Sequence, residues 1–159
     1  MMSVHDSQIK LTIRARLPDV STLGVTIRVL ADEFGLEMMA CTEIELAVVE
    51  AVTNVVKHGL NKSPDALIEI TLYSTDQLLA ITIFDQGIPM PADALDAADG
   101  SVFDYIAEDI EGWPTSGMGL SLIKAVMDEV QYNHDETGNT LRLIKKKLIT
   151  ESTHVQADN

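Results

Sequence analysis

The chain has 159 residues, and its 25 Asp and Glu against 11 Lys and Arg give a formal charge of −14. This charge argues against general binding to nucleic acids or anionic membranes, because their phosphates would be repelled. One phosphorylated ligand can still be held by backbone amides and a cation. The acidic surface also suits a basic protein partner. With 46% apolar residues, the composition predicts a globular domain and excludes wholesale disorder.

A single cysteine, Cys41, is present, so no disulfide can form within the chain and no thiolate cluster can bind zinc. No apolar run reaches the roughly 20 residues that a membrane span needs. Residues 1–8 lack the apolar segment of a signal peptide. We therefore expect a cytoplasmic domain over residues 1–150 and a flexible polar tail at 151–159.

The first part of the chain predicts one strand and two helices. Residues 9–17 alternate apolar and polar side chains, as in a strand with one buried face. A helix over residues 19–34 is expected to end at Gly35. Residues 42–58 repeat Val, Ala and Ile at intervals of three and four, which predicts a helix with one apolar stripe.

A hairpin and a long irregular segment are predicted next. Residues 66–73 and 77–84 are apolar strands joined by a short polar turn. Residues 88–115 hold three of the five prolines and many acidic side chains, with one short helix expected at 102–110. A long irregular insertion in a compact domain is usually functional.

A helix at about residues 120–129 and two strands, at 130–134 and 139–148, complete the predicted elements. The strands are mostly adjacent in the sequence, and the helices are not interposed regularly between them. This order predicts an α+β fold: a two-layer sandwich with helices on one face of a mixed β-sheet. A doubly wound parallel sheet fits less well.

Three polar residues share one stripe of the helix predicted at 42–58. Glu50, Asn54 and His58 are four residues apart and lie beside the apolar face. A carboxylate and a carboxamide so placed present a base and a neutral oxygen ligand to one spot, and Asn suits a hard cation such as Mg²⁺. The alternative is a solvated polar stripe, which is common on amphipathic helices.

Two glycine-containing motifs follow. Residues 85–87, Asp-Gln-Gly, end an apolar strand. One interpretation is a plain turn. The other is a binding pocket, in which the Asp carboxylate accepts a hydrogen bond from an exocyclic amine and the glycine lets a flat ring approach the backbone. Residues 117–119, Gly-Met-Gly, precede a helix. Free amides and the helix dipole favour phosphate there, and a flexible hinge is the alternative.

The order of these motifs resembles a known family. Residues 45–59 (ELAVVEAVTNVVKHG), 85–90 (DQGIPM) and 116–130 (SGMGLSLIKAVMDEV) are similar to the N, G1 and G2 boxes of the Bergerat-type ATP-binding fold. Gyrase, histidine kinases and related chaperones share this fold. Within that superfamily, the chain most resembles the anti-sigma factor serine/threonine kinases of bacterial partner-switching systems. The resemblance extends from about residue 9 to residue 147.

The resemblance implies roles at the phosphates. Glu50 would be the catalytic base that orients the acceptor hydroxyl. Asn54 would coordinate the Mg²⁺ that bridges the phosphates of ATP. Gly117, Met118 and Gly119 would form the cofactor-binding turn, whose backbone amides contact phosphate.

The resemblance also implies an adenine site. Asp85 would accept a hydrogen bond from the adenine amino group, and Gly87 would make room for the ring. Thr140 resembles a hydroxyl that supports this site. Residues 88–115 would be the lid over the nucleotide.

The implied function is that of a Mg-ATP-dependent kinase that phosphorylates a serine on an anti-anti-sigma partner of the STAS type. Such a kinase also sequesters a sigma or sigma-like factor and forms a homodimer. Some relatives carry an arginine in the first helix near the active site, where this chain has Gly24, with Arg28 one turn on. This departure keeps a second hypothesis open, a nucleotide-gated protein-binding module without kinase activity. An interaction domain that binds no nucleotide is the third.

Overall fold

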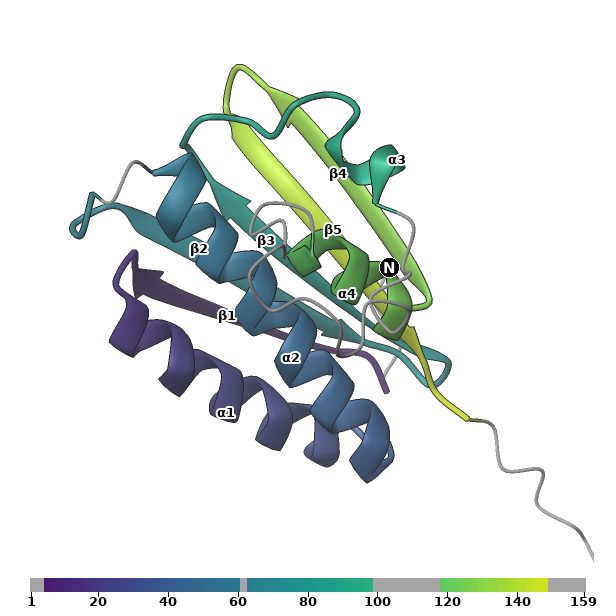
Figure 1. Ribbon diagram of the computed structural model, residues 1–159. Helices are drawn as coiled ribbons and strands as arrows, with labels where there is room; N and C mark the ends of the chain where they lie inside the picture. Colours follow the sequence, from purple (N-terminus) through teal and green to yellow (C-terminus); the bar gives the residue numbers. More distant parts are fainter. Residues whose placement is uncertain (1–4, 61–62, 99–117, 149–159) are drawn as a thin grey trace, which may run out of the picture.

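The computed structural model describes residues 5–60, 63–98 and 118–148 and has two layers, a five-stranded sheet and a set of helices on one of its faces (Figure 1). The elements are β1 (Ser7–Arg14), α1 (Leu17–Glu33), α2 (Met38–Asn54), a π-helical turn η1 (Val55–Gly59), β2 (Leu67–Ser74), β3 (Leu78–Asp85), α3 (Ala94–Ala97), α4 (Met118–Val126), β4 (Glu129–Asp135) and β5 (Gly138–Lys146). The predicted short helix at 102–110 and the tail at 151–159 lie outside the described residues.

Helix α1 begins and ends where its local sequence permits. Pro18 lies in its first turn, where backbone amides have no hydrogen-bond partner within the helix, so the missing amide hydrogen of proline costs nothing. The helix ends at Glu33 with Phe34 as its C-cap, and Gly35 adopts a φ of 87°, a left-handed conformation that glycine allows without strain. The predicted end of this helix is confirmed.

The α+β two-layer sandwich is confirmed, but the expectation of a mixed sheet is wrong. All neighbouring strands, in the order β1-β2-β3-β5-β4, pair antiparallel. Helices α1 and α2 run out and back, so the chain returns to the end of β1, where Arg14 pairs with Leu67 of β2. Strands β3 and β4 do run parallel, but β5 lies between them and pairs antiparallel with both.

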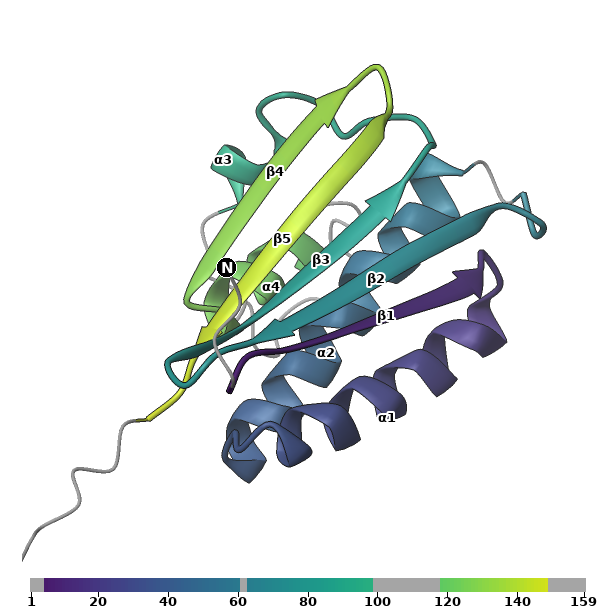
Figure 2. The ribbon, with the colours of Figure 1, turned by 180° about the vertical axis from the view of Figure 1, so that it is seen from behind.

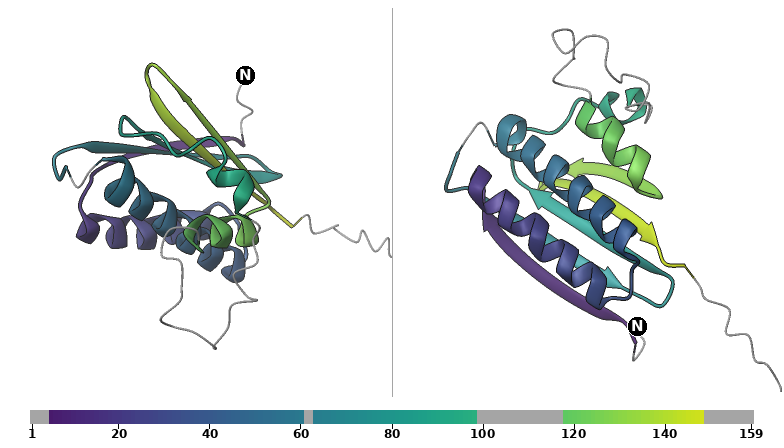
Figure 3. Two further views of the ribbon diagram at one scale, coloured as in Figure 1. Left: turned by 45° about the horizontal axis from the view of Figure 1, so that its top comes forward. Right: turned by 60° about the horizontal axis from the view of Figure 1, so that its bottom comes forward.

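The two layers are seen from the side in the left view of Figure 3. The hydrophobic core lies between them. Side chains from both layers are fully buried there, including Ile27 of α1, Ile44 of α2, Ile81 of β3 and Leu143 of β5. Within the described ranges, no helix covers the other face of the sheet, and the strands are open to view from behind (Figure 2). No helix of this part of the chain combines the length and apolar character that crossing a bilayer requires.

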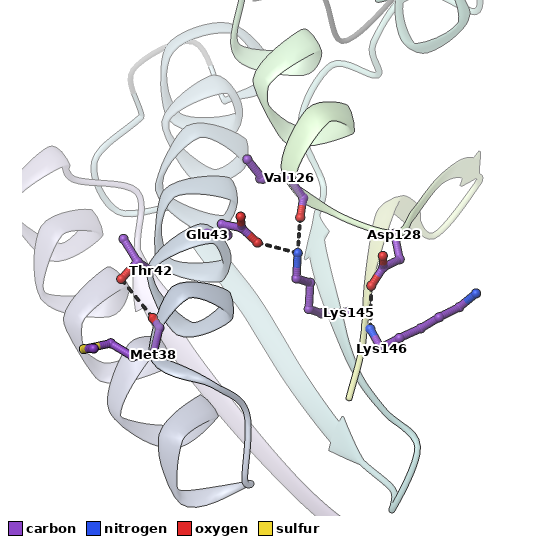
Figure 4. Close-up of polar contacts among 7 residues, drawn as sticks. All are labelled: Met38, Thr42, Glu43, Val126, Asp128, Lys145 and Lys146. Carbon is purple, nitrogen blue, oxygen red and sulfur yellow. Dashed lines mark hydrogen bonds and ion pairs between the residues drawn. The ribbon is translucent and has the colours of Figure 1, made fainter. Parts of the chain in front are cut away.

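An ion pair ties α4 to the rest of the helical layer. Lys145 of β5 points between the helices, where its Nζ lies 2.5 Å from Glu43 Oε2 of α2 and also donates to the Val126 carbonyl at the end of α4 (Figure 4). The Lys145 side chain is only 13% exposed. This cation thus satisfies a terminal carbonyl of α4 and fixes the distance between α4 and α2.

Candidate functional site

A π-helical turn ends the second helix at the site. The Leu60 amide donates to the Val55 carbonyl at 2.9 Å, a bond that spans one residue more than an α-helical bond. The continuous helix predicted up to residue 58 therefore changes its winding after Asn54. As a result, Gly59 approaches the loop after β3, where its carbonyl accepts from the Ile88 amide at 2.6 Å.

A cavity of about 520 Å³ lies beside this turn, between the helices and the β3, β4 and β5 ends of the sheet. Its volume suits a nucleotide-sized ligand, and its lining is mainly apolar. The lining residues are Ala51, Asn54, Val55, His58, Gly59, Ile83, Asp85, Ile88, Pro89, Met90, Pro91, Ala94, Leu120, Tyr132 and Leu141.

Asp85 is the one carboxylate among those lining residues. Strand β3 ends at Asp85, whose side chain is buried at 6% exposure. Its Oδ1 accepts from the Gly87 amide at 2.8 Å and from Asn139 Nδ2 at 3.1 Å. Among the residues that the structure describes, no donor reaches Oδ2, which leaves an acceptor for a ligand amine.

The turn after Asp85 has no space for a side chain at Gly87. A Cβ there would lie 2.2 Å from the Gly59 carbonyl oxygen and 3.0 Å from Asp85 Oδ1. Such contacts are far inside van der Waals distance, so only glycine fits between the π-helical turn and Asp85. The glycine of the D-x-G motif therefore serves close backbone packing at the cavity.

Glu50 and Asn54 meet the first turn of α4 at a second point. A Cβ on Gly119 would lie 3.1 Å from Glu50 Oε2 and 3.1 Å from Asn54 Nδ2. The two side chains are half-buried and come from successive turns of α2. Asn54 also lines the cavity, so it connects the Asp85 pocket with the Glu50 carboxylate.

Tyr132 closes another wall of the cavity. It lies on β4, and its hydroxyl accepts from the Met90 amide at 2.9 Å. Burial is the main cause that raises the pKa of Tyr132, and the nearby Asp85 carboxylate adds to the rise. The hydroxyl therefore keeps its proton at neutral pH and remains a donor. The sequence pattern did not identify Tyr132, because its partner is 42 residues away.

No lysine or arginine side chain lines the described part of the cavity, although His58 does. Arg28 of α1 pairs with Glu45 Oε2 at 3.2 Å rather than with Glu50. Lys124 of α4 donates to the Leu95 carbonyl at 3.0 Å. At Gly24, an added Cβ would lie 2.5 Å from Val49 Cγ2, so close helix packing excludes a longer side chain there.

The structure brings most of the predicted residues together. Glu50, Asn54 and Gly119 converge, and Asp85 lines the same cavity as Asn54. Gly87 does not line the cavity, but its amide donates to Asp85. Met118 opens α4, whereas Gly117 lies outside the described residues.

The expectation for Thr140 is not met. Thr140 pairs with Phe84, while its neighbours Asn139 and Leu141 have the buried side chains. Successive side chains of a strand point to opposite faces, so Thr140 faces away from the cavity. Asn139, directly opposite Asp85 in the sheet, occupies the place expected for Thr140.

A family model described as a histidine kinase-like ATPase domain matches residues 13–145, which include every element except the first part of β1 and the last residue of β5. The chain belongs to the histidine kinase-like ATPase domain family. Membership in this ATPase family supports ATP as the ligand of the cavity.

Relatives of this family member cover nearly the whole chain. Anti-sigma F factor of Geobacillus kaustophilus is 28% identical over 142 residues, 89% of this chain and 93% of the relative. Serine-protein kinase RsbW of Listeria innocua is 28% identical over 155 residues, 96% of each chain.

A solved structure shares the fold. The crystal structure of the RsbU and RsbW domains of Rv1364c from Mycobacterium tuberculosis aligns with a TM-score of 0.61 and 18% identity. The alignment covers 89% of this chain and 32% of that one, so this chain spans about a third of that protein. At this identity the likeness shows the fold alone.

Proposed function

We propose that the chain is a Mg-ATP-dependent protein serine kinase that also acts as an anti-sigma factor. The observation that carries this proposal is the convergence of Glu50, Asn54 and Gly119 next to the Asp85 cavity. The names of the relatives, anti-sigma F factor and serine-protein kinase, agree with both halves of it.

The cavity suits the adenine end of ATP. Asp85 Oδ2 would accept from the exocyclic amine. Gly87 would support this contact indirectly, because it lets the turn after Asp85 pack against the Gly59 backbone. The apolar side chains of Ile83 and Leu141 would contact the ring faces. Ile88, the first residue of the proposed lid at 88–115, lines the cavity and is 60% exposed, so a bound nucleotide would cover it.

The phosphates would extend toward the start of α4. The backbone amides in the first turn of α4 favour an anion, and Gly119 in this turn lies next to Glu50 and Asn54. Asn54 Oδ1 would be the protein ligand of Mg²⁺, which neutralises phosphate charge when bound. In the described ranges, no three His, Cys, Asp or Glu side chains form a metal site, so the remaining ligands would be phosphate oxygens and water.

Glu50 would act on the acceptor serine. As the serine oxygen attacks the terminal phosphorus, its proton passes to the Glu50 carboxylate, and the bond between phosphorus and the leaving ADP oxygen breaks. Asn54 would hold the phosphates beside Glu50, because it lines the cavity and lies with Glu50 next to Gly119. We also propose that the acceptor is a STAS-type anti-anti-sigma protein, that a sigma factor is the alternative partner, and that the kinase is a homodimer.

A nucleotide-gated binding module is the second candidate. The lack of Lys or Arg along the described cavity wall and the engagement of Arg28 by Glu45 favour it. In that case ATP would bind and alter partner affinity, but no phosphate would move.

The test uses Glu50→Gln, which removes the base and keeps the shape. With the STAS-type protein of the same organism as acceptor, we expect phosphoserine formation to fall at least about 100-fold, while calorimetry shows unchanged ATP binding. Glu45→Gln, on the same helix, is the matched control and should transfer phosphate normally. Full activity of Glu50→Gln removes Glu50 from the mechanism. ATP binding by the unmodified chain without any phosphoserine supports the gated module.

A further inference from the structure

Asn139 is a buried polar residue whose two side-chain hydrogen bonds go to Asp85 and to the turn that follows it. Its side chain is 4% exposed, and its Nδ2 donates to Asp85 Oδ1 at 3.1 Å and to the Gly87 carbonyl at 2.9 Å. A carboxamide nitrogen carries two hydrogens, so both donors are used. Asn139 therefore holds the carboxylate and the following turn with one rigid group.

The backbone of β5 keeps Asn139 in this position. Asn139 pairs directly with Asp85 across the sheet, so the two side chains lie on the same face. Gly138 precedes it with a φ of 151°, and a Cβ there would lie 2.5 Å from the Asp85 carbonyl oxygen. Strand β5 thus starts as close to Asp85 as the backbone allows.

The two carboxylate oxygens of Asp85 therefore have different roles. Oδ1 is occupied by the Gly87 amide and Asn139, which fixes the carboxylate plane and leaves Oδ2 for the ligand. A carboxylate without Asn139 keeps only the bond to Gly87 and can rotate about its χ2 angle. An acceptor that rotates selects less strongly for a base that carries an amine.

We propose that Asn139 is the positioning residue that makes the site selective for a purine with an exocyclic amine. This inference rests on the proposed function, because it assumes that the cavity binds ATP. Asn139 acts through Asp85, so its removal should reduce selectivity for the amine more than it reduces binding of the rest of the nucleotide.

The test compares two probes by calorimetry: ATP, and purine riboside triphosphate, which lacks only the amine. We expect the unmodified chain to bind ATP at least about 30-fold more tightly than the second probe, as for a hydrogen bond to a charged acceptor. In Asn139→Ala this ratio should fall to about threefold or less, with the affinity for purine riboside triphosphate nearly unchanged. Asn133→Ala, on the exposed part of neighbouring β4, is the matched control and should keep the full ratio.

A second variant, Asn139→Asp, tests the same role if Asn139→Ala folds poorly. It places two carboxylates together, and these repel until one takes up a proton. A protonated carboxyl again donates to its neighbour, so ATP affinity relative to the unmodified chain should recover several-fold between pH 8 and pH 6. A purely structural role predicts no such recovery.

The results distinguish the role of Asn139 from the proposed kinase function. An unchanged ratio in Asn139→Ala, or a pH-independent loss in Asn139→Asp, overturns the role of Asn139 and leaves the kinase proposal intact. An unmodified chain that binds neither probe overturns the proposed function and this inference with it.

Discussion

Gly119→Ala is expected to separate stability from phosphate transfer. Alanine favours a helix over glycine by up to about 1 kcal/mol. The new methyl would lie 3.1 Å from both Glu50 Oε2 and Asn54 Nδ2, the ends of flexible side chains. Moving them off their rotamers costs about 0.5–1.5 kcal/mol. The two effects nearly cancel, so the melting temperature should change by less than about 4 °C.

Transfer should fall much further than stability. Displacement of a catalytic group by a fraction of an ångström to 1 Å costs up to about 100-fold in rate. Single-turnover transfer from ATP to a serine acceptor, measured beside thermal unfolding, gives both numbers. Ser121→Ala, on the same helix, is the control for helix propensity. A Gly119→Ala chain that transfers phosphate normally would show that Glu50 and Asn54 do not act at this contact.

Two further substitutions test the packing around the site. Gly87→Ala should destabilise the fold by about 1–3 kcal/mol and abolish measurable ATP binding. The added methyl would lie 2.2 Å from the Gly59 carbonyl oxygen, so the two backbone segments must separate. Urea unfolding measures the loss of stability and calorimetry the loss of binding, and normal ATP binding would contradict this prediction. Lys145→Met should cost about 2–4 kcal/mol, because it leaves Glu43 and the Val126 carbonyl without their donor. Arg28→Ala should cost less than about 1 kcal/mol, because the Arg28 side chain is 48% exposed, against 13% for Lys145. Equal losses by urea unfolding would refute the expectation that burial of the cation sets the cost.

Local patterns were sufficient for most of the elements and for most of the site, although the short helix α3 was not predicted. The apolar stripe of α2 placed Glu50 and Asn54 beside the core face, and the strand end at Asp85 placed a carboxylate next to a glycine. These relations need only the periods of helix and strand. Strand order was not predictable in this way, because it depends on where the chain crosses between β3 and β4.

The side chains around the proposed adenine site were harder to predict from the sequence. A period of two means that a shift of one residue exchanges the two faces of a strand. The family resemblance implied Thr140 as the functional side chain, but the pairing of Asp85 with Asn139 puts the preceding residue on the inner face. Tyr132 escaped detection for a related reason, since its role depends on a contact with the distant Met90.

The π-helical turn at 55–59 makes the length of this segment matter more than its composition. Each residue of a helix turns the chain by about 100°. A one-residue deletion within the turn would restore regular winding and rotate Gly59 away from Gly87 and Ile88, which it contacts through its carbonyl. Homologous chains should therefore tolerate substitutions at Val55 or Lys57 more readily than any insertion or deletion between Asn54 and Gly59.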